Sequence, residues 1–325
     1  MTSTNLPVLI LKRNEDRRLS AGHLWVYSNE VDTRQSPLSA FEPGSLAVIQ
    51  SAAGKTLGAG YVNPRSLICA RLLTRRPRAA LDAGFFERRL RTALSLRESL
   101  FEQPYYRLVF GESDGLPGLV VDRYGSVLVV QITTAGMEAV RDLLLEVLDR
   151  IFSPSGMLLR NDSSVRLLEG LTQETQVIGE VPETVVLTEG GVQFEVPLGA
   201  GQKTGWFYDQ RSNRQAMHKY VKGKRVLDVF SYIGAWGLQA AAAGAAEVKE
   251  HIKYMKPSTS KGSGPYKESM VEIKLETVTM KQLVGYLHRI ESPKNVTSIK
   301  RISIKGNKKE PGYLDVVLQV LTLNK

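Results

Sequence analysis

Residues 226–237 have the sequence VLDVFSYIGAWG, and this stretch decides the fold class. Its apolar start predicts a buried strand ending at Asp228, and Gly234 predicts a tight turn into a helix of small residues. At the carboxyl end of a parallel strand, such a turn lets a ligand approach the backbone N–H groups of the helix N-terminus. The pattern alone fits a purely structural turn of a doubly wound sheet equally well.

The preceding loop, residues 201–211 with the sequence GQKTGWFYDQR, favours a binding function. It concentrates glycines, aromatic rings, a cation and amide side chains immediately before a predicted helix, and few structural loops need all of these. A hairpin is predicted for residues 184–197, because the adjacent Gly190 and Gly191 permit the positive φ of a tight turn. Strands and helices also alternate upstream, so we predict an α/β and β multi-domain chain.

Both segments resemble the cofactor-binding part of S-adenosylmethionine-dependent ribosomal RNA methyltransferases. Three upstream segments resemble, in the same order, the large-subunit RNA cytosine-5 methyltransferase family with an N-terminal PUA domain: GHLWVYSNEV (22–31), YVNPRSLICARLL (61–73) and FGESDGLPGLVVDRYG (110–125). The resemblance covers roughly residues 7–248, and several long motifs in fixed order are more specific than one glycine pattern. It implies a PUA-like fold, an incomplete Rossmann-like methyltransferase fold, S-adenosylmethionine as cofactor and ribosomal RNA as partner.

The resemblance also assigns cofactor-binding residues. Those implied to lie beside the methionine and ribose parts of the cofactor are Asp228, Ser231, Tyr232 and Gly234. Those implied to close over it are Phe207, Asp209 and Gln210. These residue types suit a sulfonium cofactor, which favours aromatic faces and carboxylates, whereas a pyrophosphate needs N–H donors and cations.

The PUA-like domain is implied to bind RNA. The residues predicted to contact RNA phosphates are Arg13, Arg17, Arg18, His23 and Lys203. A solvated basic face over the core aromatic residues Trp25 and Tyr27 explains the N-terminal cluster equally well, because phosphate contacts leave no sequence signature. RNA recognition by shape and unpaired bases suits a family that modifies a base within a folded RNA.

Cys69 is the single cysteine, so the sequence predicts no internal disulfide and a reducing, cytoplasmic location. Methylation at cytosine C5 needs a thiolate that attacks the ring, and the resemblance implies such a cysteine downstream of the glycine turn. That cysteine and the family's Asp-Pro-Pro segment are absent from the sequence, and Cys69 is expected to be a small buried side chain. We therefore predict little or no methyltransferase activity for this chain.

Amino-acid usage changes near Val248. The chain has a net charge of +10, of which residues 249–325 carry +8, and alanine disappears there. Lysine replaces arginine as the main cation, which suggests two unrelated joined pieces because the two residues are largely interchangeable on solvated surfaces. Residues 265–325 predict a β-α-β-β order and resemble, over LVGYLHRIESPKNVTSIKRISI, the ferredoxin-like part of pilus-assembly and type II secretion accessory proteins.

Five segments follow from these patterns. They are a PUA-like RNA-binding domain (1–76), an α+β middle domain (77–183), the start of a methyltransferase domain (184–248), a linker (249–264) and an unrelated β-α-β-β segment (265–325). No run approaches the ~18 apolar residues that span a bilayer, so no membrane contact is expected. His251 and His288 are isolated, so no metal site is expected.

The leading function is methyl transfer from S-adenosylmethionine to cytosine C5 of large-subunit ribosomal RNA. One alternative is a noncatalytic RNA-binding protein whose PUA-like and middle domains fold. Another is a fusion whose tail is a protein-interaction module. The oligomeric state stays open.

Overall fold

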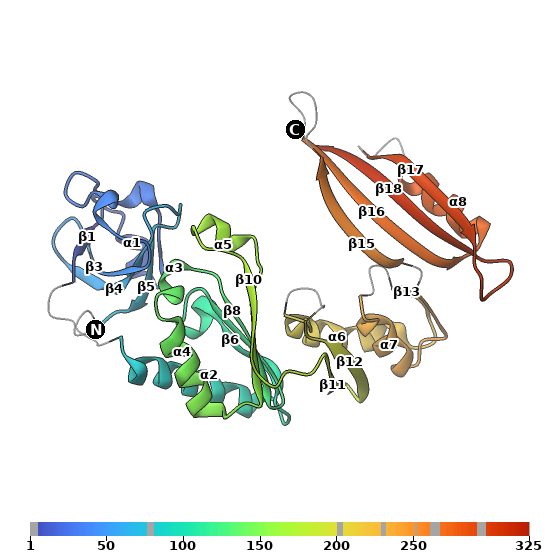
Figure 1. Ribbon diagram of the computed structural model, residues 1–325, viewed down its shortest axis with the longest axis horizontal. Helices are drawn as coiled ribbons and strands as arrows, with labels where there is room; N and C mark the ends of the chain where they lie inside the picture. Colours follow the sequence, from blue (N-terminus) through green and yellow to red (C-terminus); the bar gives the residue numbers. More distant parts are fainter. Residues whose placement is uncertain are drawn as a thin grey trace. The chain divides into compact units, whose positions relative to one another are not determined.

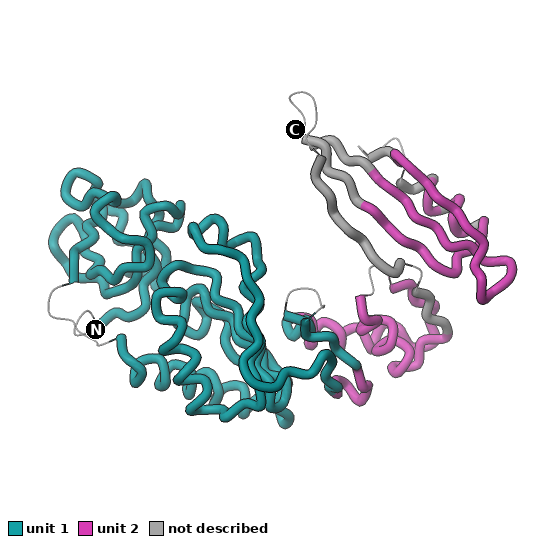
Figure 2. The backbone as a smooth tube through the Cα atoms, viewed as in Figure 1, with its two compact units in different colours: residues 1–187, 195–209 teal, residues 188–194, 210–325 magenta. Residues whose placement is uncertain are grey.

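The computed structural model describes residues 6–76, 81–199, 204–228, 232–250, 252–260, 267–290 and 297–324. The chain divides into two units, coloured separately in Figure 2. Unit 1 comprises Met1–Leu187 and Glu195–Asp209, and unit 2 comprises Thr188–Phe194 and Gln210–Lys325. The chain therefore passes between the units both at the predicted hairpin and at the predicted binding loop.

The N-terminal part of unit 1 is a five-stranded sheet with the order β1-β3-β4-β5-β2. Its strands are β1 (Val8–Ile10), β2 (Trp25–Val26), β3 (Ser45–Gln50), β4 (Thr56–Val62) and β5 (Ala70–Thr74). Short helices connect them: α1 (Arg17–Ser20), η1 (Ser28–Glu30) and η2 (Leu38–Ala40). Ala47 and Ile49 alternate with less buried residues along β3 and join a buried cluster with Leu9, Leu72 and Cys69. These short strands are the β-rich fold that the PUA resemblance implied.

A second five-stranded sheet, with the order β10-β9-β8-β7-β6, follows in unit 1. Its strands are β6 (Tyr105–Phe110), β7 (Leu119–Tyr124), β8 (Val127–Ile132), β9 (Gly156–Asn161) and β10 (Glu174–Gly179). The helices are α2 (Ala83–Leu100), η3 (Gly111–Asp114), α3 (Ala135–Glu138), α4 (Arg141–Phe152) and α5 (Val165–Leu168). Antiparallel pairs dominate this sheet, and β8 and β9 pair in parallel across α4, so the middle of unit 1 is α+β as predicted.

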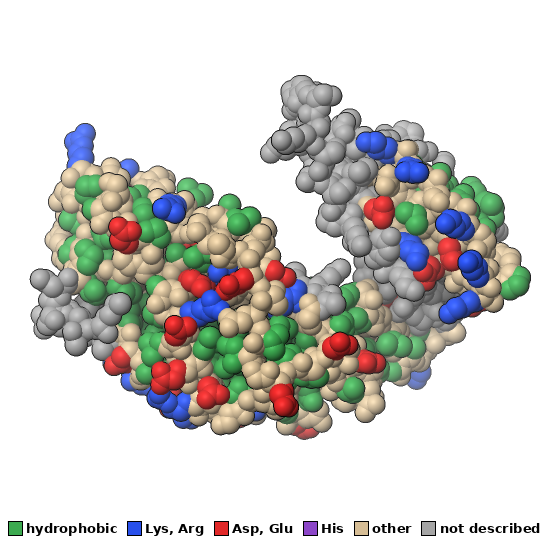
Figure 3. Space-filling view, in the orientation of Figure 1, with side chains coloured by type: hydrophobic (Ala, Val, Ile, Leu, Met, Phe, Trp, Pro, Cys, Tyr) green, Lys and Arg blue, Asp and Glu red, His purple; other side chains and the backbone are tan. Residues whose placement is uncertain are grey.

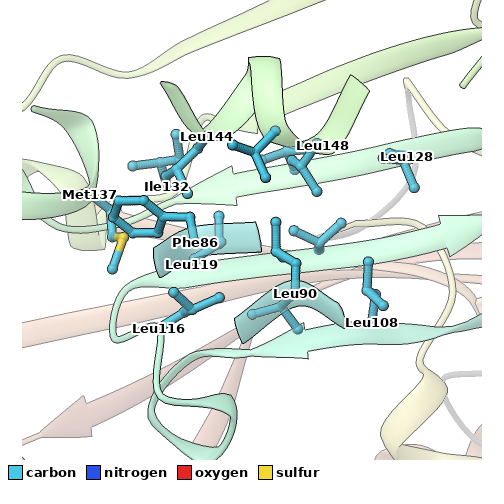
Figure 4. Packing of buried hydrophobic residues seen from close by; sticks show 14 of the residues in the cluster. Phe86, Leu90, Leu108, Leu116, Leu119, Leu128, Ile132, Met137, Leu144 and Leu148 are labelled. Carbon is cyan, nitrogen blue, oxygen red and sulfur yellow. The ribbon is translucent and has the colours of Figure 1, made fainter. Parts of the chain in front are cut away.

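Helices α2 and α4 pack on the second sheet through their apolar faces (Figure 4). Phe86 and Leu90 of α2 are fully buried, as are Leu144 and Leu148 of α4, one turn apart in each helix. These side chains meet Leu108 of β6 and the strands beside it. Asp82 caps α2 by accepting a hydrogen bond from the backbone N–H of Phe85. The spacing of Phe86 and Leu90 in the sequence therefore places one apolar face of α2 in the core.

A buried junction fastens the two sheets of unit 1 to each other. The ring of Tyr61 in β4 lies against Gly136 of α3, where an added Cβ would come within 1.9 Å of the ring. The Tyr61 hydroxyl lies 2.7 Å from the carbonyl oxygen of Pro117 and 3.0 Å from Thr134 Oγ1. These buried, hydrogen-bonded groups join the PUA-like part and the middle part within one compact unit.

The segment that continues toward the predicted cofactor turn is made of short elements. They are the hairpin of β11 (Thr184–Glu189) and β12 (Val192–Pro197), then η4 (Tyr208–Gln210), α6 (Arg211–Val221), β13 (Arg225–Asp228), α7 (Ala235–Ala242) and β14 (Glu247–Glu250). The predicted hairpin, loop-to-helix step and strand-turn-helix are all present (Figure 1). The prediction of a buried strand at residues 226–228 is wrong in part, because Leu227 is 57% exposed. Among the described residues β13 pairs with β14 alone, so a central strand's two neighbours are not both present.

The last strands form a four-stranded antiparallel sheet with the order β15-β16-β18-β17. Its elements are β15 (Ile252–Ser260), β16 (Lys267–Val278), α8 (Met280–Ile290), β17 (Thr297–Gly306) and β18 (Leu314–Asn324). The β-α-β-β order is observed, and β14 and β15 occupy most of the described residues in the segment that was expected to be a linker, 249–264. β15 lies at the sheet edge, a position that tolerates a polar, lysine-containing sequence. In the described part of the chain, no helix is long and apolar enough to cross a membrane.

Candidate functional site

The carboxylate of Asp228 links the end of β13 to the first turn of α7. Asp228 ends β13, is 8% exposed, and its Oδ2 accepts a hydrogen bond of 2.8 Å from the backbone N–H of Gly237. Burial raises the pKa of Asp228, and the Gly237 N–H offsets only part of this shift. Gly234 has φ 76° and Tyr232 has φ 55°, so the backbone turns through the left-handed region twice before α7 begins. Ser231 lies outside the described residues.

β14 lies parallel to β13 and extends the carboxyl edge of this small sheet. The register pairs Val226 with Val248 and Asp228 with Glu250. Glu250 therefore occupies the end of the second strand, beside the strand end that carries Asp228. In open parallel sheets, ligands bind at this edge.

The predicted binding loop is anchored on β7 by a buried polar cluster. Arg107 Nε and Nη2 donate to the two carboxylate oxygens of Asp122 at 2.9 and 3.0 Å, and the Thr204 hydroxyl donates to Asp122 Oδ2 at 2.5 Å. Asp122 is 0% exposed. Burial by itself disfavours the charge of Arg107, but Asp122 outweighs it and raises the pKa of that guanidinium. Burial dominates at Asp122 itself and raises the pKa of that carboxyl, although Arg107 and Thr204 lower it. The ion pair and the Thr204 hydroxyl together hold the loop at Thr204.

Two tyrosines extend the same anchor along the loop. The Tyr124 hydroxyl donates to the carbonyl oxygen of Thr204 at 3.1 Å and accepts from the Trp206 N–H at 2.7 Å. The Tyr208 hydroxyl donates to the carbonyl oxygen of Arg123 at 2.9 Å. Between these fixed points Phe207 is half-buried, and the next residue after Tyr208, Asp209, is exposed. β7 thus fixes alternate loop residues.

A second buried cluster holds the helix that follows the loop. Glu189, at the end of β11, accepts from Arg214 Nε at 2.6 Å and Nη2 at 2.9 Å, and from Arg211 Nε at 3.2 Å. Gln239 of α7 donates to the carbonyl oxygen of Glu189, and its Oε1 lies 2.9 Å from His218 Nε2. The cluster therefore ties α6 and α7 to the hairpin end, while Gln210, half-buried, directly precedes α6.

The structure gathers Asp228, Tyr232 and Gly234 at one turn, and Phe207 and Asp209 on one anchored loop. Neither anchor was predicted from the sequence. The available signals were charges of opposite sign inside the adjacent apolar strands β6 and β7, and two arginines three residues apart on α6. Such charges inside apolar patterns are buried only when paired.

Most residues predicted to contact RNA lie on the segment that contains α1. Arg13, Arg17 and His23 are exposed, and Arg75 Nη2 lies 3.5 Å from the His23 carbonyl oxygen. Arg18 instead pairs with Glu30 at 2.8 Å and lies over the Tyr27 ring. On the face drawn in Figure 3, described Lys and Arg side chains of unit 1 are interspersed with Asp and Glu side chains.

Two other predicted RNA-site features have different outcomes. Lys203 lies outside the described residues. Trp25 is half-buried and donates from Nε1 to Glu112 Oε1 at 2.6 Å, so this aromatic residue joins the two parts of unit 1. The structural explanation weighed for Trp25 is thereby favoured.

Cys69 is buried as expected. It is 0% exposed within the first sheet, its Sγ lies 3.5 Å from the Val26 carbonyl oxygen, and burial raises its pKa to about 12. A thiol in this state is a poor nucleophile at neutral pH. Among the described residues, no group of three or more His, Cys, Asp and Glu side chains is arranged to hold a metal ion.

Comparison with known families identifies two kinds of domain. Residues 9–75 match the family described as PUA-like domain, and residues 165–264 match the family described as S-adenosylmethionine-dependent methyltransferase. The chain thus combines a PUA-like domain with an S-adenosylmethionine-dependent methyltransferase domain. The second match passes Val248 and ends after β15.

Several curated relatives carry the name ribosomal RNA large subunit methyltransferase I. The protein from Aliivibrio fischeri (strain MJ11) is 40% identical over 245 residues, which are 74% of this chain and 61% of the relative. The protein from Klebsiella pneumoniae (strain 342) is 37% identical over 253 residues, 76% of this chain and 62% of the relative. The chain therefore spans somewhat less than two thirds of these relatives.

Two solved structures share the fold. SMU.776, described as a methyltransferase and solved with SAH, superposes with a TM-score of 0.65 at 16% identity, over 98% of this chain and 100% of that chain. A protein from Streptococcus mutans, described as SAM-dependent, gives a TM-score of 0.64 at the same identity and coverage. At this identity the likeness concerns the fold alone.

The residues of the β13–α7 turn fit the cofactor that the family description names. The backbone has positive φ at Gly234, where the absence of a side chain allows close approach of a ligand, and a backbone N–H fixes Asp228 at the strand end. A carboxylate and an aromatic ring at this edge also suit a positively charged sulfonium group.

Proposed function

We propose that this chain binds S-adenosylmethionine at the β13–α7 turn, and that its family's reaction is methyl transfer to C5 of cytosine in large-subunit ribosomal RNA. The observation that carries the proposal is the buried Asp228 carboxylate, bonded to Gly237 N–H at the carboxyl end of a parallel strand inside the methyltransferase match. The name of the curated relatives supports the RNA substrate.

In this proposal the turn and the loop have different roles. Asp228, Ser231, Tyr232 and Gly234 lie beside the methionine and ribose parts of the cofactor. The anchored loop contributes Phe207, Asp209 and Gln210, which close over it. When bound, the cofactor supplies an electrophilic methyl group, and the chain's residues orient it and exclude water.

The RNA-binding role is assigned to the PUA-like domain. The exposed Arg13, Arg17 and His23 contact phosphates, together with Arg18 and Lys203. Phosphate contacts of this kind provide affinity and position the RNA, and base recognition requires other groups.

Catalysis at C5 needs a thiolate, and Cys69 cannot provide it. We propose that residues 1–325 alone bind cofactor and RNA with little or no methyl transfer. The change of composition near Val248 and the ferredoxin-like character of residues 265–325 belong to the same proposal, in which the tail is unrelated to the methyltransferase.

Calorimetric titration of the purified 325-residue chain with S-adenosylhomocysteine tests the cofactor site. We expect one binding site per chain, and about tenfold weaker binding for Asp228→Asn. Asp142→Asn, an exposed carboxylate at the start of α4, is the matched control and should bind like the wild type. Absence of binding by the wild type, or equal binding by both variants, would contradict the assignment.

A noncatalytic RNA-binding protein is the second candidate, favoured by the exposed Arg13 and Arg17 and by the buried single thiol. It predicts RNA binding that weakens steeply with salt and no calorimetric signal from the cofactor product. Filter binding across a salt series, run beside the calorimetry, separates the two functions.

A further inference from the structure

A cavity of about 180 Å³ opens in unit 1 where the PUA-like part meets the middle part. It has one lining residue from β5 and others from the β6–η3 step, from β7 and its preceding turn, from the β8–α3 step and from α5. Its lining includes the polar or aromatic side chains of Arg71, Phe110, Glu112, Ser113 and Thr133.

The walls of this cavity are held in place by buried polar contacts. Arg71 Nη1 pairs with Glu169 Oε1 at 2.9 Å, with the two side chains 10% and 2% exposed. Glu112 Oε1 accepts from Trp25 Nε1 at 2.6 Å, which joins a cavity wall to β2. A site with fixed walls loses little conformational entropy when a ligand binds.

The lining offers an aromatic surface beside a hydrogen-bond acceptor. Phe110 is 54% exposed, and the Arg107 guanidinium carbon lies 5.5 Å from its ring centroid. The Arg71 charge is balanced by Glu169, whereas within the described part of the chain no cation pairs with Glu112. A ligand that combines a flat ring with N–H donors would satisfy both features.

The size of the cavity restricts that ligand to a single ring system. Sites for drug-sized ligands commonly measure roughly 300–1,000 Å³, and this cavity is smaller. The walls also include the PUA-like strand β5, which leads to the exposed Arg75 beside His23. A basic segment within the same compact unit favours a ligand that carries phosphates outside the cavity.

We propose that this cavity receives one unpaired RNA base that carries an exocyclic amino group. The base stacks on Phe110, and its amino N–H groups donate to the Glu112 carboxylate, while Ser113 and Thr133 offer hydroxyl groups at the rim. The inference rests on the proposed RNA substrate and adds a base-recognition site away from the β13–α7 turn. Stacking on aromatic rings and hydrogen bonding at base edges are the usual means of reading single-stranded RNA.

Fluorescence anisotropy with labelled single-stranded uridine hexamers tests the site, using one central guanosine or one central inosine. Inosine lacks only the exocyclic amino group, so we expect the wild type to bind the guanosine hexamer about fivefold or more tightly. In Glu112→Gln one carboxylate oxygen becomes an NH₂ donor, and the preference should disappear. Phe110→Ala should weaken both hexamers about tenfold.

Matched controls lie on the exposed face of α2. Glu98→Gln and Leu96→Ala change an exposed carboxylate and an exposed apolar side chain outside the cavity, and should leave affinity and preference unchanged. Thermal unfolding followed by circular dichroism verifies that each variant folds. Calorimetry with S-adenosylhomocysteine reports on the cofactor site in the same samples.

Three outcomes would overturn the inference, and they can be told apart. If the wild type binds RNA without preferring guanosine, or if the cavity variants match the controls, the base site is wrong and the proposed RNA substrate stands. If no hexamer binds while the cofactor product does, the RNA substrate and the base site both fail. If Glu112→Gln weakens binding of an arginine-rich peptide but not of RNA, the cavity binds a protein side chain and the base site is wrong.

Discussion

Glu169 is a carboxylate that several parts of unit 1 hold in place. Its oxygens accept from Arg71 at 2.9 Å and from Asn63 Nδ2 at 2.7 Å, and its side chain is 2% exposed. Removing one partner of a buried ion pair leaves the other uncompensated, which costs about 3–5 kcal/mol. We expect Glu169→Gln to lower the free energy of unfolding by about 3 kcal/mol in urea titrations. The exposed Glu98→Gln serves as control, and an equal effect of both variants would contradict the role of Glu169.

The same residue predicts a pH dependence. Burial alone raises the pKa of Glu169, but Arg71 and Asn63 outweigh burial and hold that pKa below its usual value of 4.5. The folded state therefore binds fewer protons than the unfolded state, so the contribution is complete above that value and is lost as pH falls through the lower folded pKa. Urea titrations between about pH 6 and pH 3 should show a steeper loss for the wild type than for Glu169→Gln. Parallel curves would show that another group is responsible.

Adding a side chain at Gly136 should also lower the stability of the protein. An added Cβ would lie 1.9 Å from the Tyr61 ring, and overpacking a filled interior costs about 1–3 kcal/mol. Gly136→Ala should therefore lower the midpoint of thermal unfolding by several degrees. Gly199→Ala is the control, since nothing lies within 4 Å of an added Cβ there. Unchanged unfolding of Gly136→Ala would mean that the junction is looser than the structure shows.

At the scale of elements, the anchor between β7 and the binding loop is the feature to test. Asp122→Asn keeps the shape but removes the charge that holds Arg107 and the Thr204 hydroxyl. We expect at least tenfold faster amide hydrogen exchange in the peptide that contains Trp206, because this loop loses a buried fixed point. Exchange measured by mass spectrometry for Asp142→Asn should match the wild type, and faster exchange throughout unit 1 in Asp122→Asn would indicate general destabilisation instead.

Elements with strong local patterns could be predicted from the sequence. Adjacent glycines revealed the β11–β12 hairpin, and Asp228 with Gly234 revealed the strand-turn-helix. Exposure of Leu227 could not be predicted, because it depends on which strands lie beside β13. Strand β15 was not predicted for a related reason. Its pairing with β16 outweighs the low strand propensity of its polar sequence.

The site residues also divide into those visible from local sequence and those that depend on distant partners. Asp228 stands beside a glycine turn, so its place at the strand end was visible from local sequence. The partners of Asp122 and Glu189 lie 82 residues and 25 residues away along the chain, at Thr204 and Arg214. No local pattern encodes such pairings, which only the folded sheet brings together.

At the scale of the whole molecule, the buried clusters belong to separate units. The two large clusters lie in unit 1, and the cluster around Leu318 and Leu283 lies in unit 2. We expect denaturant unfolding in two steps, because cooperative transitions require a shared core. Trp236 is the tryptophan of unit 2, so fluorescence of Trp236→Phe follows unit 1 alone. Coincidence of its midpoint with that of far-ultraviolet circular dichroism would contradict independent unfolding.

The composition of the chain changes within a strand. Val248 pairs with Val226, and the strand continues to Glu250, so β14 contains residues from both sides of the predicted join. The predicted domain boundaries stay predictions, and the methyltransferase match also passes this point. Peptide mapping across residues 240–265 of the purified protein should recover a continuous peptide if the two parts are truly one chain. Peptides with a different sequence after Val248 would show that residues 249–325 are not part of the purified protein.

The contact between Tyr61 and Gly136 has an evolutionary consequence. One residue lies in the PUA-like part and the other in the middle part, so neither position can change size without regard to its partner. Lineages in which position 136 gains a side chain should have replaced the tyrosine with a smaller residue, and the two columns should covary. A PUA-like domain exchanged from a distant relative would then be tolerated only when the residue at position 61 comes with the matching residue at position 136.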